Sequence, residues 1–103
     1  MGNYVLGYKG GAMAETPEAQ EAAMAAWGAF FAGLGSAVVE VGNPFGPATT
    51  VKADRSTSPL TGGLTGYSVV QADSLELAAK LTEGCPLFEA GGTVEVYETI
   101  DVM

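Results

Sequence analysis

Histidine is absent from this chain of 103 residues, and that absence removes the commonest source of acid–base chemistry near neutral pH. Triads and histidine general bases are therefore excluded. Cysteine is almost absent as well. Cys85 stands alone, so no intrachain disulfide is possible, and without histidine zinc has no plausible ligand set. Neither a calcium-loop spacing nor a phosphate-binding glycine motif occurs, so we expect no metal and no cofactor.

Positive charge is also scarce. The four basic residues, Lys9, Lys52, Arg55 and Lys80, face twelve acidic ones, which gives a formal net charge of −8. They are scattered along the chain and form no stripe that could neutralise phosphates. Nucleic acid and anionic membranes are therefore poor partners, and the acidity mainly favours solubility.

Long apolar runs are missing too. No stretch reaches membrane-spanning length, and the first residues show neither the basic region nor the apolar region of a secretory signal. Gly2 suggests a myristoylation site, but position 6 is Leu6 instead of serine or threonine. We therefore expect a cytoplasmic protein.

The residues that are present indicate one small folded domain over 1–103. Apolar residues make up 48% and charged residues 16%, a globular composition. A chain of this size buries only roughly 60–70% of its unfolded surface, so burial in a dimer would add stability.

The first half predicts a strand, a helix and a strand. Residues 3–9 favour a strand, and Thr16 followed by Pro17 is typical of a helix start. Apolar residues then recur at helical spacing through Trp27, Phe31 and Leu34. A second strand is expected over 36–41, and the Pro/Gly-rich segment 42–47 is expected to be an irregular loop.

The second half repeats that order without a sequence repeat. Residues 49–54 predict a short edge strand, and 55–66 a polar, mobile segment. A strand over 67–72 precedes a helix that either an Asp73 capping box or Ser74 can cap, and Cys85-Pro86 ends it. Residues 93–100 form the last predicted strand, with Val94, Val96 and Ile100 on one face.

This order predicts an α+β fold of the ferredoxin-like β-α-β-β-α-β kind. Both helices would cover one face of the sheet. Adjacent apolar pairs such as Val38-Val39 and Val69-Val70 point to opposite faces, so the second face is also partly apolar. We therefore expect two sheets to pack face to face in a homodimer, which gives a dimeric α+β barrel.

Several short segments resemble YCII-related proteins, and especially their DGPF-type branch. They are 66–75, Gly84-Cys85-Pro86 and 91–96, together with 24–28 and the loop 42–47. The resemblance spans nearly the whole chain. It implies a dimeric α+β barrel, and some relatives are fused to, or encoded beside, extracytoplasmic-function sigma factors.

The chain departs from that family in two ways. Founding YCII-type members carry a His-Asp pair proposed as catalytic, and this chain has no histidine. The Asp-Gly-Pro-Phe motif is also absent. Asn43-Pro44-Phe45 only echoes it, at a different place.

Seven residues are candidates for a ligand pocket: Lys9, Met24, Trp27, Phe31, Glu40, Asn43 and Tyr67. The cationic Lys9 ends a strand beside two glycines, and Glu40 lies in an otherwise apolar strand, where a carboxylate on an inner face could serve as a general base. The aromatic and Met residues lie on one helix face, Tyr67 offers a hydroxyl, and Asn43 begins the loop. Each also has a plain structural role, in core packing, in a loop hydrogen bond or as a solvated charge.

We expect a small-molecule-binding homodimer of unassigned activity, and the sequence leaves open whether it is an enzyme. Two alternatives remain. One is an accessory dimerisation module of sigma-factor-type regulation. The other is a degenerate enzyme that has lost the family's His-Asp pair.

Overall fold

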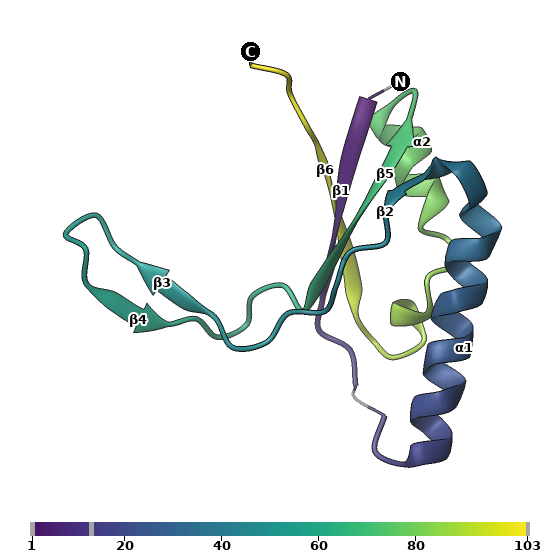
Figure 1. Ribbon diagram of the computed structural model, residues 1–103, viewed down its shortest axis with the longest axis horizontal. Helices are drawn as coiled ribbons and strands as arrows, with labels where there is room; N and C mark the ends of the chain where they lie inside the picture. Colours follow the sequence, from purple (N-terminus) through teal and green to yellow (C-terminus); the bar gives the residue numbers. More distant parts are fainter. Residues whose placement is uncertain (1, 13, 103) are drawn as a thin grey trace.

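The computed structural model describes residues 2–12 and 14–102 as an antiparallel sheet with two helices on one side and a hairpin on the other (Figure 1). In chain order the elements are β1 (Gly2–Lys9), α1 (Pro17–Leu34), a 3₁₀ turn (Gly35–Ala37), β2 (Val38–Glu40), β3 (Thr49–Val51), β4 (Thr57–Pro59), β5 (Gly66–Ala72), α2 (Leu75–Leu81), a second 3₁₀ turn (Pro86–Phe88) and β6 (Thr93–Glu98). The main sheet has the order β2-β5-β1-β6, with β3 and β4 paired separately. The chain is therefore an α+β protein, as predicted.

The long helix α1 begins where the sequence predicts. The Thr16 hydroxyl accepts a hydrogen bond from the backbone N–H of Ala19 at 3.0 Å, and Pro17 occupies the first turn. The helix ends at Gly35, whose φ of 56° suits glycine and whose N–H bonds back to the Phe31 carbonyl. No helix within 2–12 and 14–102 is long and apolar enough to cross a membrane.

The core lies between the sheet and the helices. Strand register places Tyr4, Leu6 and Tyr8 of β1 on the face that the helices cover, beside Val70 of β5. Phe30 of α1, Ala78 of α2 and the residues Cys85 and Leu87 after α2 complete the buried cluster. Leu6 and Val70 are completely buried, so the centre of the sheet anchors both helices.

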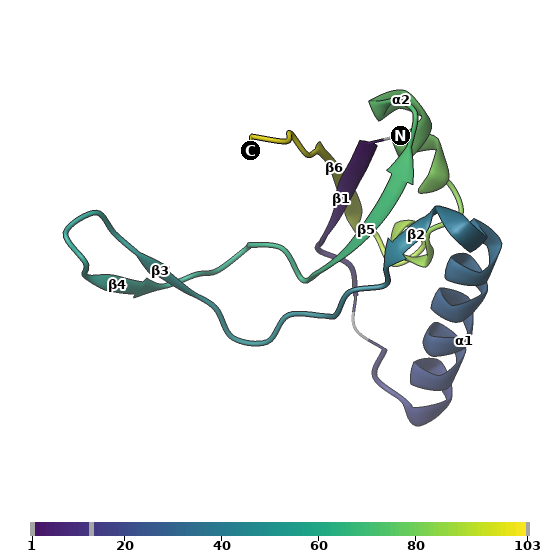
Figure 2. The same cartoon turned by 45° about the horizontal axis from the view of Figure 1, so that its top comes forward.

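The opposite face of the sheet carries no helix. We call it the open face and define it by Val5 and Gly7 of β1, Tyr67 and Val69 of β5, and Glu95 and Tyr97 of β6. Figures 1 and 2 show both helices on one side of the sheet, while the β3–β4 hairpin and the C-terminal segment after β6 leave on the other. Leu64, at the base of that hairpin, packs over Gly7, where an added Cβ would meet the leucine methyl groups at 3.0 Å.

The second helix resolves an alternative in the sequence. Ser74, and not Asp73, caps α2, because its hydroxyl accepts from the backbone N–H of Leu77 at 3.2 Å. The helix is short and ends at Leu81. A turn follows, in which the Thr82 carbonyl accepts a hydrogen bond from the Cys85 N–H. Pro86 then opens a 3₁₀ turn instead of continuing the helix.

The segment 49–66 differs from its prediction. Residues 49–51 are not an edge strand of the main sheet; they pair with β4, which lies in the segment 55–66 that we expected to be polar and mobile. Two backbone hydrogen bonds between Lys52, Arg55 and Ser56 close the turn, and the Asp54 carboxylate accepts from the Ser56 N–H at 2.9 Å. These local bonds form the hairpin, and its polar composition hid the second strand.

Two predicted strands are shorter than expected. Residues 36–37 belong to a 3₁₀ turn, and a bulge lies between Val38 and Glu40 of β2. The last strand ends at Glu98, so Ile100 does not share a face with Val94 and is 76% exposed. Just beyond the strand, Thr99 still bonds to β1, because the Asn3 carbonyl accepts from both its N–H and its hydroxyl.

Candidate functional site

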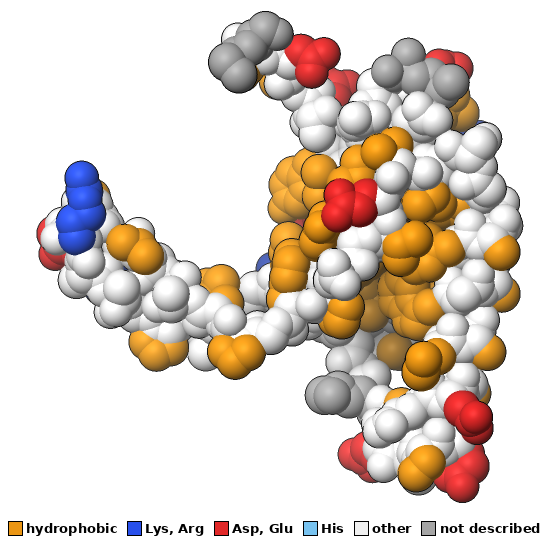
Figure 3. All heavy atoms as spheres, in the orientation of Figure 1, with side chains coloured by type: hydrophobic (Ala, Val, Ile, Leu, Met, Phe, Trp, Pro, Cys, Tyr) orange, Lys and Arg blue, Asp and Glu red, His pale blue; other side chains and the backbone are white. Residues whose placement is uncertain are grey.

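A cavity of about 600 Å³ lies between α1 and the edge of the sheet. Figure 3 shows it as a hollow surrounded by hydrophobic side chains beside the long helix. Its lining consists of Tyr8, Ala23, Met24, Trp27, Phe31, Val41, Gly42, Asn43, Pro44, Thr65, Gly66, Tyr67, Ser68 and Leu87. None of these residues is charged, so the cavity suits an uncharged molecule better than an ion.

The helix side of the cavity is aromatic. The Trp27 ring meets the Tyr8 ring edge to face, with centroids 5.0 Å apart and planes at 71°, and Phe31 lies 5.9 Å from the same indole. Trp27 and Phe31 are four residues apart, so one helical face presents both. Met24 lies one turn earlier and is 75% exposed, which places a flexible side chain at the opening.

The sheet side of the cavity carries a short chain of hydrogen bonds. The Tyr8 hydroxyl donates to the Ser68 hydroxyl at 2.8 Å, and Ser68 donates to the Val41 carbonyl. Ser68 is completely buried and Tyr8 nearly so. Burial raises the pKa of Tyr8 to about 12, although the bond to Ser68 opposes that shift. Tyr8 is therefore neutral at physiological pH and can exchange hydrogen bonds with a ligand.

The third wall is backbone of the loop after β2 and of the start of β5, which run side by side. The Asn43 carbonyl accepts from the Tyr67 N–H at 3.3 Å, and Pro44 forms an isolated bridge with Gly66. Gly42 makes this approach possible. Its φ is 78°, and an added Cβ would lie 1.8 Å from the Tyr67 carbonyl oxygen.

The structure brings five of the seven predicted pocket residues to this cavity: Met24, Trp27, Phe31, Asn43 and Tyr67. Lys9 does not line it. It ends β1 and is exposed.

Glu40 does not line the cavity either, because the bulge in β2 sets it opposite Val69 on the open face. There its carboxylate accepts from the Tyr67 hydroxyl at 2.5 Å. The hydrogen bond to Glu40, followed by partial burial, raises the pKa of Tyr67. Tyr67 therefore borders the cavity from β5, but its side chain lies on the open face, where the hydroxyl meets Glu40 and the ring stacks on Phe45 with centroids 5.6 Å apart.

Tyr8 and Ser68 line the cavity but were not among the residues predicted for the site. Alternation along the strand gave a partial signal for Tyr8, because it shares a face with Tyr4 and Leu6. No sequence signal pointed to Ser68, since serine is common within strands and does not by itself indicate a site. Its role depends on the Val41 carbonyl, which only the folded chain brings near.

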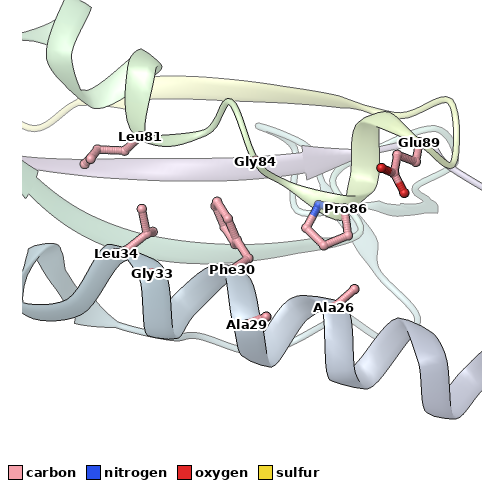
Figure 4. Close-up of a pocket in the computed structure, with 9 residues that line it drawn as sticks. All are labelled: Ala26, Ala29, Phe30, Gly33, Leu34, Leu81, Gly84, Pro86 and Glu89. Atoms are coloured by element: carbon pink, nitrogen blue, oxygen red, sulfur yellow. The ribbon is translucent and has the colours of Figure 1, made fainter.

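A second hollow, of about 530 Å³, lies between α1 and the segment that follows α2. Figure 4 shows Phe30 and Leu34 of α1 below it, with Leu81 and Pro86 above. Most of its remaining lining is alanine or glycine, and Glu89 is its one charged member. Small side chains without convergent polar groups give a ligand little to recognise, so the first cavity is the better candidate.

Reactive groups elsewhere do not gather into a site. Within 2–12 and 14–102, no three His, Cys, Asp or Glu side chains lie together as a metal would require. Cys85 is buried, and that burial raises the pKa of its thiol, which keeps it protonated and unreactive.

The chain matches no family model, no curated protein and no solved structure. The resemblance to YCII-related proteins therefore stays a prediction.

Proposed function

We propose that this protein is a homodimer that binds a small, uncharged and largely apolar organic molecule in the cavity between α1 and the sheet. The observation that carries the proposal is the lining of that cavity. It joins an aromatic wall around Trp27 to the hydrogen-bonded hydroxyls of Tyr8 and Ser68 without a charged side chain. Such a combination holds a molecule by apolar contact and orients it by one or two hydrogen bonds.

Binding accounts for the lining better than catalysis does. Tyr8 is the titratable side chain that faces the cavity, because the Tyr67 hydroxyl is bonded to Glu40 on the open face, and the pKa of Tyr8 is raised. A general base active near neutral pH needs a pKa near that pH, which a tyrosine with a raised pKa does not offer. The proposed activity is therefore capture or transport of a ligand and not its chemical conversion.

The finer fold and the dimer belong to the same proposal. The order β2-β5-β1-β6, with helices after β1 and β5, supports a ferredoxin-like sandwich of the kind found in YCII-related proteins. The open face supports assembly, because Val5 and Val69 lie there without a covering helix. A second sheet packed about 10 Å away would cover them.

A fluorescent dye tests the cavity directly. N-phenyl-1-naphthylamine is uncharged and aromatic, and its emission rises in an apolar site. We expect it to bind the native protein, and we expect Met24→Asp to raise its Kd by about tenfold or more, since an apolar dye that packs against a carboxylate at the opening removes part of the hydration of that carboxylate. Leu75→Asp is the matched control, because Leu75 is exposed on α2 and does not line the cavity.

Truncation of the aromatic wall provides the second variant. Trp27→Ala should abolish dye binding while the protein stays dimeric, whereas Phe88→Ala removes an exposed ring outside the cavity and should bind normally. Unaltered binding by both Met24→Asp and Trp27→Ala would show that the dye sits elsewhere and would refute the cavity assignment.

A further inference from the structure

Residues 45–64 form a projecting arm that contains the hairpin β3–β4. Every residue from 44 to 62 is exposed except Ser58, which is half-buried. Figures 1 and 2 both show the arm leaving the body on the side of the sheet away from the helices. The arm therefore extends into the space in front of the open face.

The hairpin is ordered by its own hydrogen bonds but has little to support it. Its strands have three residues each, and bonds such as the one from Leu60 N–H to the Ala48 carbonyl at 3.2 Å hold its base. A short two-stranded hairpin is at best marginally stable alone in water. Val51 is 62% exposed and Leu60 48% exposed, so the arm presents apolar side chains that another surface would cover.

The distribution of charge indicates which surface covers the apolar side chains of the arm. Lys52 and Arg55 at the tip, with Asp54 between them, give the arm a net charge of +1, and the tip is blue in Figure 3. The rest of the chain holds two lysines and eleven acidic residues, a net charge of −9. Opposite charge steers association, so the tip of one copy is attracted to the body of another.

The length of the arm fits the same partner. Lys52 lies seven positions after Phe45, and an extended chain covers roughly 3.3 Å per residue, or about 23 Å. Two sheets packed face to face are only about 10 Å apart. An arm of that length that starts at one open face must extend past the facing sheet and lie along its side.

We propose that each arm lies across the side of the partner's sheet in the homodimer, with Val51 and Leu60 covered there and with Lys52 and Arg55 against carboxylates of the second copy. This inference rests on the proposed homodimer. Nucleic acid and anionic membranes fit less well, because the body beside the arm is strongly acidic.

Zero-length crosslinking tests the contact. A carbodiimide joins a lysine amine to a carboxylate only where the two touch. Crosslinking a mixture of unlabelled and ¹⁵N-labelled full-length protein distinguishes bonds between copies from bonds within one. We expect Lys52 to give mixed-isotope crosslinks to acidic residues of the other copy. Lys80, an exposed lysine on α2, is the internal control and should give few.

Dimer affinity, measured by analytical ultracentrifugation, gives an independent readout. Lys52→Glu should weaken the dimer by about tenfold at low salt and by less at high salt. Lys80→Glu makes the same change in net charge and should weaken it less than about twofold. A shortened arm, in which Asn-Gly replaces 49–59 between Ala48 and Leu60, should weaken the dimer by at least about tenfold.

The outcomes separate this inference from the dimer itself. If the protein is dimeric, but Lys52 crosslinks only within its own chain and the shortened arm leaves the dimer Kd unchanged, the arm contact is wrong and the dimer stands. If the native protein is monomeric at micromolar concentration, the homodimer fails, and the arm contact fails with it.

Discussion

At the scale of single residues, Tyr8 connects the two halves of the candidate site. Its ring packs against Trp27 of α1, and its hydroxyl donates to Ser68 of β5. Ser68 in turn reaches the Val41 carbonyl, so three segments that are distant in sequence share one hydrogen-bonded chain. The aromatic wall and the polar side of the cavity therefore depend on one side chain.

The raised pKa of Tyr8 predicts a pH-dependent stability. Its pKa is about 12 in the folded chain, against 10.0 ordinarily, because burial disfavours the phenolate. The folded state thus holds the proton more tightly, and this contribution is complete below about pH 10 and is lost as pH rises through about 12. The free energy of unfolding of the native protein should therefore fall across that window.

Tyr8→Phe isolates this effect in denaturant titrations at pH 8 and at higher pH. The variant should be less stable at pH 8 by about 1 kcal/mol, from the lost bond to Ser68. The native protein's advantage should shrink between about pH 10 and 12, because phenylalanine does not titrate. A gap that stays constant with pH would mean that Tyr8 is not the group responsible.

At the scale of elements, the sequence predicted α1 and the central strands well. The Thr16-Pro17 start and the spacing of Trp27 and Phe31 depend on local chemistry, which is visible along the chain. Helical spacing therefore also identified the aromatic wall of the cavity. A short strand was expected around β3, but β4 and its pairing with β3 were missed, because these polar residues carry no burial pattern and bury almost nothing in the single chain.

Two predicted site residues, Glu40 and Lys9, do not line the cavity, and the reason is similar for both. Glu40 points away from the cavity because of the bulge in β2. No residue in that segment is of a type that would have predicted a bulge from the sequence. Lys9 is the last residue of β1, and the direction of its side chain depends on the conformation of the loop that follows. Strand ends and bulges are set by tertiary pairing, which the sequence does not reveal locally.

The crossing of the loop after β2 with β5 gives a prediction at this scale. Gly42→Ala should lower the free energy of unfolding by at least about 2 kcal/mol, because alanine is strained at positive φ and its Cβ would meet the Tyr67 carbonyl. Gly46→Ala is the control, since no atom lies within 4 Å of its added Cβ. It should change stability by less than about 0.5 kcal/mol. Equal effects in chemical denaturation would contradict the close approach.

At the scale of the whole molecule, the chain is divided by its sheet. The helices, the core and the cavity lie on one side, and the open face and the arm lie on the other (Figure 2). The proposed ligand site and the proposed dimer contact therefore use opposite sides of the sheet, yet they share the segments around Asn43 and Gly66 at the root of the arm. The loops that wall the cavity are also those that set the direction of the arm.

Native mass spectrometry of the freshly purified full-length protein is the sharpest test of a ligand-binding homodimer, because it reports assembly and any retained ligand together. We predict a dimer that carries a small organic mass, and the mass should be lost in Met24→Asp while the dimer persists. A dimer without bound mass that also fails to bind N-phenyl-1-naphthylamine would contradict the ligand site. A monomer at micromolar concentration would contradict the homodimer, and the open face would then need another explanation.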